Sequence, residues 1–503
     1  MIRKSGVVIS LIGIIILLTT GLVAAQAEGP IEEWVANYHR SNNGGNVARA
    51  IAVDNSGNVY VTGGSSDLAS KYNEYSTIKY DSNGNRLWID MYHGSTERIF
   101  NCAYDIVVDL LGNVYVTGSI GDAFATIKYD KYGNQIWVSK YNGPTYGGNG
   151  AIAMVLDEYG NVYVTGTSWG GMTTQSDWAT IKYDSNGNQL WAARYDGPGN
   201  VYDIDEAKDI AVDGSGNVYV TGFSEGLEAD CDYLTVKYNS DGDEIWVARY
   251  NGPDNARDEA NAVILDSMNN VYVTGSSYVS RCQNYDYATI KYNSDGIQQW
   301  IRRYDGLNGC GMDKANAIAL DASGNIYVTG ESSFNYAQNY ATIKYDSNGN
   351  QLWMAKYSGP EGYESVANDI TLDEEGNIYV TGKSWGPLGH DYATIKYDND
   401  GRQLWAARYT RGCANAIVVD SANNVYVTGY SDNYSNRYNC FTTIKYSQSE
   451  LNLHPTVPPL PPPQTPQAAP KISILVIVAL SLLAIAAVAV LVLVFRRRRI
   501  EDN

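Results

Sequence analysis

The sequence has few of the residues from which most catalytic and metal sites are built. Its 503 residues include four histidines and six cysteines. His39, His93, His390 and His454 are scattered, and no CxxC pair, HExxH run, Ser/His/Asp spacing or glycine-rich phosphate loop occurs. Zinc sites and the common hydrolase and nucleotide sites depend on such clusters. We therefore expect no metal centre, no catalytic residues and no enzyme activity of these kinds.

Basic charge is also scarce. The chain has 36 Lys and Arg against 55 Asp and Glu, which gives a formal net charge of -19 at pH 7. Binding to a phosphate backbone requires a basic patch, so the composition excludes nucleic acid as a partner. A strongly acidic balance is typical of a surface that stays soluble after export.

Long apolar runs occur only near the two ends. Residues 7–22 follow the basic start MIRKSG and lead into small residues up to Ala27, which predicts a signal peptide over residues 1–27. An uncleaved signal anchor is the alternative. An uncharged run over residues 472–495 predicts a transmembrane helix over residues 471–495, followed by a short basic cytoplasmic tail, residues 496–503. This pattern predicts a single-pass plasma-membrane protein with its N-terminus outside and an extracellular ectodomain.

A proline-rich segment precedes the predicted membrane helix. Residues 451–470 hold eight of the 14 prolines. Proline cannot pair within a sheet and favours the extended polyproline form, so we expect a stalk here. The folded ectodomain is then residues 28–450.

The ectodomain is rich in residues of strands and turns, and it repeats. The chain has 42 Tyr, 11 Trp and 49 Gly, and aromatic residues favour strands while glycine supplies turns. The string VYVTG or IYVTG recurs eight times, 47 to 56 residues apart, which is the size of a propeller blade. Its central tyrosines are Tyr60, Tyr115, Tyr163, Tyr219, Tyr272, Tyr327, Tyr379 and Tyr426.

Each copy predicts four short antiparallel strands. In the first copy they are residues 51–54, 58–63, 76–81 and 86–92, separated by turn signals. Separate hairpins would leave many sheet edges open, whereas radial repetition of such units forms a β-propeller. The sequence therefore predicts an all-β propeller of four-stranded blades.

The fourth strand shows how the propeller closes. A tryptophan marks it in seven copies, at Trp88, Trp137, Trp191, Trp246, Trp300, Trp353 and Trp405. The eighth copy ends at IKYSQSE without one, while EEWVANY near the N-terminus places Trp34 and Tyr38 in the matching positions. We therefore expect eight blades, with the N-terminal strand completing the last.

The pattern GNVYVTG followed by TIKYDSNGNQLW resembles the SBBP repeat of bacterial and archaeal extracellular β-propellers, and the likeness covers residues 31–446. The family name implies seven blades, whereas the repeats counted here give eight. The tail DSNGNQLW is more weakly similar to the eight-bladed quinoprotein repeat. That second resemblance would imply a cofactor pocket with adjacent cysteines, which this sequence lacks.

One face of the predicted propeller has turns of constant length. The step from the Asp that ends the first strand to the Asn that opens the second is four residues in every copy, as from Asp54 to Asn58. Glycine or asparagine precedes that Asn, and both tolerate a left-handed backbone. Strings such as DSNGN and NSDGDE alternate oxygen donors, but they lack the glutamate at position twelve of a calcium loop. We expect no cofactor, with calcium as the alternative.

The opposite face has loops of varied length and composition. Between the VTG glycine and the aromatic residue of the third strand lie 11 residues in the first copy and five in the second. Binding residues of scaffold folds concentrate in such loops, although loops also drift where packing does not constrain them. Six aromatic residues are candidate ligand contacts: Tyr72, Trp169, Tyr278, Phe334, Trp385 and Tyr434.

A second set of candidates lies at the predicted channel mouth. An alanine recurs at the start of all eight first strands, where crowding around the axis favours a small residue. The residue after it is usually polar. Candidate ligand contacts at these positions are Arg49, Tyr104, Lys208, Asn261, Asn316, Asn368 and Asn415, with Ile152 in the third copy.

All six cysteines fall on or beside the variable face. An even number in an exported chain is consistent with disulfides. Cys413 and Cys440 belong to the same copy, which favours their pairing. Cys231 with Cys282 would join neighbouring copies, although Cys310 competes for Cys282.

These features favour a non-catalytic surface module that binds an extracellular protein or glycan through its variable face, in adhesion or envelope organisation. A polysaccharide hydrolase or lyase that uses loop carboxylates is the alternative. A third hypothesis is a spacer without a specific ligand.

Overall fold

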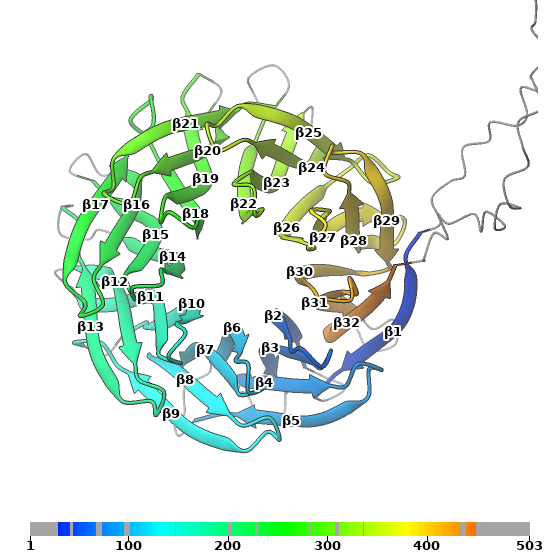
Figure 1. Ribbon diagram of the computed structural model, residues 1–503, viewed down its shortest axis with the longest axis horizontal. Helices are drawn as coiled ribbons and strands as arrows, with labels where there is room; N and C mark the ends of the chain where they lie inside the picture. The colour runs from blue at the N-terminus through cyan, green and yellow to red at the C-terminus, as the bar shows by residue number, and fades with distance from the viewer. Residues whose placement is uncertain are drawn as a thin grey trace, which may run out of the picture. The chain divides into compact units, whose positions relative to one another are not determined.

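The computed structural model shows eight four-stranded antiparallel sheets arranged radially around a central channel, as the sequence predicts (Figure 1). No helix occurs in the residues that the structure describes. These residues are 29–40, 44–66, 73–94, 101–145, 147–172, 174–198, 204–226, 230–281, 283–306, 311–334, 337–432 and 439–448.

Each blade runs from an inner strand at the channel to an outer strand at the rim. The inner strands are β2 (Asn46–Val53), β6 (Asn101–Val108), β10 (Gly150–Leu156), β14 (Asp205–Val212), β18 (Asp258–Leu265), β22 (Asp313–Leu320), β26 (Ser365–Leu372) and β30 (Gly412–Val419). The second strands are β3 (Val59–Ser66), β7 (Val114–Ile120), β11 (Val162–Gly171), β15 (Val218–Glu225), β19 (Val271–Val279), β23 (Ile326–Phe334), β27 (Ile378–Gly386) and β31 (Val425–Asp432).

The third strands are β4 (Asn73–Tyr80), β8 (Ala123–Tyr129), β12 (Gln175–Tyr183), β16 (Cys231–Tyr238), β20 (Asn284–Tyr292), β24 (Ala337–Tyr345), β28 (Gly389–Tyr397) and β32 (Asn439–Ser447). The outer strands are β5 (Arg86–Tyr92), β9 (Gln135–Tyr141), β13 (Gln189–Tyr195), β17 (Glu244–Tyr250), β21 (Gln298–Tyr304), β25 (Gln351–Tyr357), β29 (Gln403–Tyr409) and β1 (Ile31–Tyr38). We number the blades 1 to 8 in the order of their inner strands.

The N-terminal strand closes the ring. β1 pairs antiparallel with β32, the third strand of blade 8, placing Trp34 opposite Lys445 and Tyr38 opposite Phe441. In Figure 1 the blue β1 lies beside the orange β32 at the edge of the ring. The inner strand β2 also contacts β30 and β31, so blade 1 packs directly on blade 8. The predicted count of eight blades and the predicted closure are both confirmed.

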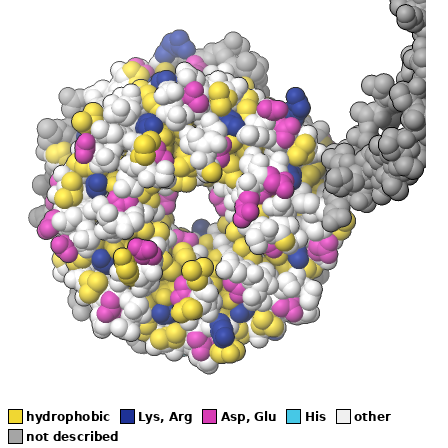
Figure 2. All heavy atoms as spheres, in the orientation of Figure 1, with side chains coloured by type: hydrophobic (Ala, Val, Ile, Leu, Met, Phe, Trp, Pro, Cys, Tyr) yellow, Lys and Arg dark blue, Asp and Glu magenta, His cyan; other side chains and the backbone are white. Residues whose placement is uncertain are grey.

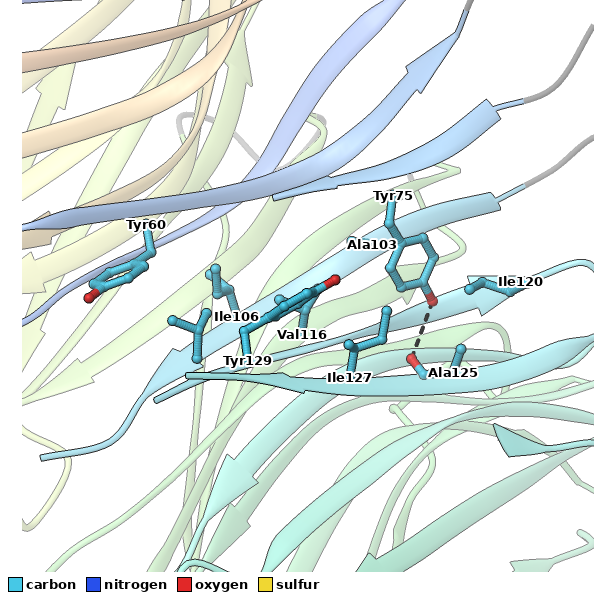
Figure 3. Packing of buried hydrophobic residues seen from close by; sticks show 10 residues of the cluster. Tyr60, Tyr75, Ala103, Ile106, Val116, Ile120, Ala125, Ile127 and Tyr129 are labelled. Atoms are coloured by element: carbon cyan, nitrogen blue, oxygen red, sulfur yellow. Dashed lines mark hydrogen bonds between the residues drawn. The ribbon is translucent and has the colours of Figure 1, made fainter. Parts of the chain in front are cut away.

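The hydrophobic core lies between blades, not within them. At the contact of blades 1 and 2, Tyr60 and Tyr75 pack against Ile106, Val116 and Ile127 of the next blade (Figure 3). The hydroxyl of buried Tyr75 donates to the carbonyl of Ala125 in that blade, at 3.3 Å. Equivalent clusters occur around the ring. Each blade therefore depends on both neighbours for burial, which explains why one long repeat folds as a single unit.

The recurrent tryptophans and lysines connect neighbouring blades. Trp88 Nε1 in blade 1 and Lys79 Nζ of the same blade both donate to the carbonyl of Lys131 in the turn of blade 2, at 3.3 and 3.1 Å. Trp34 repeats the arrangement at the closure, donating to the carbonyl of Ser82 at 3.1 Å. A Cβ on Gly84 in that turn would lie 2.7 Å from the indole, and its φ is +83°. The turn therefore requires glycine both for its backbone and for the tryptophan that covers it.

The constant turns are held by their own side chains. Asp54 Oδ1 accepts hydrogen bonds from the backbone N–H groups of Ser56 and Asn58, while its Oδ2 accepts from the Asn58 side chain and the Tyr60 hydroxyl. Gly57 has φ +73°, and Asn269 in the fifth copy has φ +59°. The hydrogen bonds of Asp54 account for the fixed four-residue step from Asp to Asn. The positive φ values confirm the predicted left-handed backbone at the residue before that Asn.

Several predictions from the ends of the chain concern residues outside those described. They are the signal peptide (1–27), the stalk (451–470), the transmembrane helix (471–495) and the basic tail (496–503). Among the residues described, no helix has the length and apolar character of a membrane span.

Candidate functional site

The described part of the variable face consists largely of extended hairpins. The sequence predicts loops after the VTG glycine, but in blades 3, 5, 6 and 7 the second and third strands continue as a paired ladder beyond it. Trp169 faces Ser176, Tyr278 faces Tyr285, and Trp385 faces His390 across these hairpins. Side chains on paired strands are held more firmly than side chains on loops, so these hairpins present preformed surfaces.

The three described aromatic candidates occupy equivalent positions but differ in exposure. The indole of Trp169 is half-buried and lies close to Gly147. Tyr278 stacks edge-on with Tyr285, with ring centroids 5.3 Å apart. Trp385 is 39 % exposed and stands edge-on to His390, with centroids 4.9 Å apart. The side chain of Phe334 and the candidates Tyr72 and Tyr434 lie outside the described part of the chain.

Charged residues surround Trp385. Glu364 pairs with Lys383 and lies 3.0 Å from His390 Nε2. Burial raises the pKa of Glu364, but the hydrogen bonds from Lys383 and His390 outweigh it and leave the pKa below its usual value. Glu331 in the neighbouring blade has a raised pKa because burial outweighs the attraction of Lys314 and Lys383. An exposed indole beside several hydrogen-bonding charges can contact both the apolar and the polar parts of a ligand.

In blade 7, an arginine of the outer strand holds the variable-face hairpin by hydrogen bonds. Arg408 donates to Asp391 Oδ2 at 2.8 Å, to Ser384 Oγ at 2.8 Å and to the carbonyl of Trp385 at 3.1 Å. The same position is arginine in blades 3, 4, 5 and 7, and only those blades carry aspartate two residues before the third-strand residue that pairs with it. The four pairs are Arg194 with Asp177, Arg249 with Asp232, Arg303 with Asp286 and Arg408 with Asp391.

Breaking one of these pairs should destabilise the protein markedly. Arg408→Ala leaves the nearly buried carboxylate of Asp391 without its cation, for which we expect a loss of ~3 kcal/mol. The double variant Arg408→Ala/Asp391→Ala should lose less than the single one, because no buried charge remains. Urea unfolding measures both. Arg402→Ala, which removes an exposed arginine 4.0 Å from Asp400, is the control with little expected change. Additive losses would contradict the account.

The predicted channel-mouth residues lie at a β-bulge in each inner strand. Pairing with the second strand shifts by one residue after each recurrent alanine, as between Ala48 and Ala50, and the skipped residue is the candidate. Four asparagines use this position to bridge blades. Each donates from Nδ2 to the recurrent alanine carbonyl of the next blade at 2.7 Å: Asn261 to Ala315, Asn316 to Ala367, Asn368 to Ala414, and Asn415 to Ala48.

The channel-mouth residues Arg49, Tyr104 and Lys208 are not asparagines and make cation–π contacts. The Arg49 guanidinium lies over the Tyr104 ring, 4.9 Å from its centroid. Lys208 pairs with Glu206 and lies 5.2 Å from the centre of the Phe223 ring. Blades 1, 2 and 4 thus present cations and an aromatic ring where blades 5 to 8 present bridging amides.

Three carboxylates of the inner strands were not predicted from the sequence. Asp105, Asp209 and Asp369 stand two residues after the recurrent alanine, where the other five copies have alanine. Figure 2 shows acidic side chains, in magenta, close to the rim of the central opening. Each of the three aspartates accepts one hydrogen bond from a backbone N–H of its own strand and one from the next blade, as Asp105 does from Ile106 and Met154. Desolvation by the surrounding protein raises their pKa values to about 6, 7 and 6 respectively. Repulsion among the carboxylates adds to the shifts of Asp105 and Asp209.

Cavities open on both faces. A cavity of about 270 Å³ on the variable face is lined by Asp232, Arg249 and Asn251. On the constant face, a cavity of about 470 Å³ lies between blades 3 and 4 beside Tyr159 and Lys182. Cavity volume alone therefore does not favour the variable face, which differs from the constant face in its side-chain chemistry.

The predicted pairing of Cys413 with Cys440 is not formed. Both thiols are free, and they lie on β30 and β32 with β31 between them. Two strand spacings of ~4.8 Å separate such residues by ~10 Å, beyond the span of a disulfide. Cys231 is also a free thiol, and its predicted partner Cys282 lies outside the described residues.

Comparison with known proteins agrees with the repeat. The SBBP family, described as a β-propeller repeat, matches residues 199–226 and 356–389. No curated protein matches the chain. A solved protein of unknown function from Dyadobacter fermentans is 9% identical, with 84% of this chain and 100% of that one covered and a TM-score of 0.40. The polysaccharide lyase Uly1 is 10% identical, with 83% and 100% covered and a TM-score of 0.43.

The radial sheets and the eightfold motif define the class: this is an eight-bladed β-propeller built from one repeated blade. The family matches fall on the link and first hairpin of blade 4 and on the corresponding part of blade 7. The chain therefore carries SBBP-type β-propeller repeats.

Proposed function

We propose that this chain is a membrane-anchored cell-surface propeller that binds an extracellular protein or glycan through its variable face, as a non-catalytic module of adhesion or envelope organisation. The anchor and the location rest on the apolar run over residues 471–495 and the basic residues after it. The binding role rests on the variable face.

The observation that carries the binding role is the group around Trp385. An indole that is 39 % exposed stands at the end of a paired hairpin, beside His390, Glu364 and Lys383. Exposed aromatic residues with hydrogen-bonding neighbours are typical of recognition sites. The hairpin is held by Arg408, so little conformational freedom is lost when a ligand binds.

A binding screen tests this function. The fragment 28–450 would be applied to arrays of envelope glycans and to extracellular proteins of neighbouring cells, with and without calcium. We expect at least one ligand whose binding weakens tenfold or more in Trp385→Ala. The matched control is Tyr159→Ala, which removes an exposed aromatic from the constant face. A ligand lost in Tyr159→Ala and retained in Trp385→Ala would overturn the assignment.

One observation favours a glycan-active enzyme as the second candidate. Glu331 and Glu364 interact electrostatically, and their pKa values shift in opposite directions, upward for Glu331 and downward for Glu364. A raised and a lowered carboxyl is the arrangement that acid–base cleavage of polysaccharides uses. Turnover of an envelope polysaccharide, abolished in Glu331→Gln, would establish this function in place of simple binding.

A further inference from the structure

Two carboxylate triads lie at equivalent contacts between blades on the variable face. The first joins Asp177 of β12, Asp196 of the following link and Asp205 of β14. In each triad one oxygen from every carboxylate lies within 4.8 Å of the other two. The second triad, two blades further on, is Asp286 of β20, Asp305 of the link and Asp313 of β22.

Each triad contains a buried carboxylate oxygen without a hydrogen-bond donor. Asp313 is fully buried, its Oδ2 accepts from the backbone N–H of Gly306 at 2.9 Å, and the Ser332 side chain also interacts with its carboxyl group, while no donor within hydrogen-bond geometry reaches its Oδ1. Asp177 is 3 % exposed and its Oδ1 likewise has no partner. Leaving a buried charged acceptor unsatisfied is costly, so such an oxygen requires a further partner, which is a water molecule or an ion.

The charge at each triad is only partly balanced. Arg303 pairs with Asp286 at 3.0 Å, and Arg194 pairs with Asp177. One guanidinium against three carboxylates leaves a formal charge of about two negative units. Arg281, which is exposed, approaches Asp305 no closer than 3.9 Å. The repulsion is visible in Asp313, whose pKa is raised to about 6 by burial and by the charges of Asp286 and Asp305.

The geometry also provides an entry path. Asp196 and Asp305 are exposed, whereas the deepest members, Asp205 and Asp313, are fully buried. A cation arriving from solvent would meet the exposed carboxylate first and then the buried oxygens. Ligands made only of carboxylate oxygen suit a hard divalent cation that keeps water in its remaining positions.

We propose that the two triads bind Ca²⁺, one ion each, and tie blade 3 to blade 4 and blade 5 to blade 6. The bound ion would neutralise the residual charge and occupy the unpartnered oxygens of Asp177 and Asp313. The contact between blades 4 and 5 has Asp232, Asn251 and Asp258 at the same positions. With an amide in place of the exposed carboxylate, that contact should bind Ca²⁺ more weakly.

Titration of the purified full chain with Ca²⁺, followed by calorimetry, tests the proposal. We expect two sites with dissociation constants on the order of 10⁻⁴ to 10⁻³ M, the range of extracellular calcium modules. Asp196→Asn and Asp305→Asn copy the natural Asn251, and each should weaken one site tenfold or more. The thermal midpoint of the wild type should rise with Ca²⁺, and that of the double variant should not.

A matched control separates these sites from general acidity. Asp241→Asn/Asp295→Asn removes two exposed carboxylates from turns of the constant face and should leave both sites unchanged. Both Asp→Asn variants at the triads alter exposed side chains, so they should fold normally, and circular dichroism checks this. Absence of stoichiometric Ca²⁺ binding by the wild type, or equal binding by Asp196→Asn/Asp305→Asn, would overturn the proposal. Mg²⁺ binding as tight as Ca²⁺ binding would also contradict it.

Discussion

Replacing Trp34 with alanine should cost ~3 to 4 kcal/mol of stability and open the ring at blade 8. The indole packs between Tyr80 and Tyr426, with centroids 6.1 and 6.2 Å away, and donates to the carbonyl of Ser82. Truncating a large aromatic residue in a packed site costs this much. Urea unfolding gives the loss, and hydrogen exchange shows where it acts. Amides of β1 and β32 should lose protection first.

The matched control is Trp191→Ala in blade 3. Trp191 makes the same hydrogen bond, to the carbonyl of Ser240 at 3.0 Å, and packs on Tyr163 and Tyr238. Its loss should cost a similar amount, but the strands β1 and β32 should stay protected because their contacts are intact. Deleting residues 28–40 removes the whole closing strand and should destabilise blade 8 more than Trp34→Ala does. A deletion that leaves the melting temperature unchanged would refute the closure.

The protein should become more stable as the pH falls from 7 to 5, because of the channel carboxylates. The pKa values of Asp105, Asp209 and Asp369 are raised to about 6, 7 and 6 from 3.8. A raised pKa means that the folded state binds protons more tightly than the unfolded state. The resulting stabilisation is complete below pH 3.8 and is lost as the pH rises through about 6 to 7. We expect ~1 to 2 kcal/mol per carboxylate between pH 7 and pH 5.

The triple variant Asp105→Ala/Asp209→Ala/Asp369→Ala tests this dependence. Alanine occupies the same position in the other five copies, so the backbone tolerates it. Urea midpoints at pH 5 and pH 7 should differ clearly in the wild type and much less in the variant. The buried Asp258 and Asp313, whose pKa values are also about 6, should keep a smaller dependence in place. Equal pH dependence in both proteins would exclude the channel carboxylates as its source.

The sequence allowed most of the fold to be predicted because the repeat displays every constraint eight times. The absence of a fourth-strand tryptophan from the last copy, together with Trp34 near the start, was sufficient to predict the closure confirmed by the pairing of β1 with β32. The glycines of the constant turns were predicted from turn geometry, and all of these turn glycines have positive φ, as at Gly84. A feature shared by all copies can be deduced from its recurrence.

The candidate site was less predictable because its residues occur in single copies. Trp385 is a candidate from the sequence alone, but nothing in its local pattern shows that Glu364, from the link before β26, pairs with Lys383 and His390 beside it. The channel carboxylates could have been found by comparing copies, since Asp105 replaces the usual alanine. The disulfide prediction failed because shared blade membership ignores the strand that separates Cys413 from Cys440.

The central claim is that the variable face, and not the constant face, binds the ligand. An exchange of hairpin ends tests this claim most directly. The ends of the variable-face hairpins of blades 5 and 7, residues 277–286 and 384–391, would be transferred onto a propeller that does not bind the ligand found in the screen. Our account predicts that the recipient gains binding, with at least a tenth of the original affinity, and loses it again with Trp385→Ala. Binding that stays with the donor after its hairpin ends are replaced would contradict it.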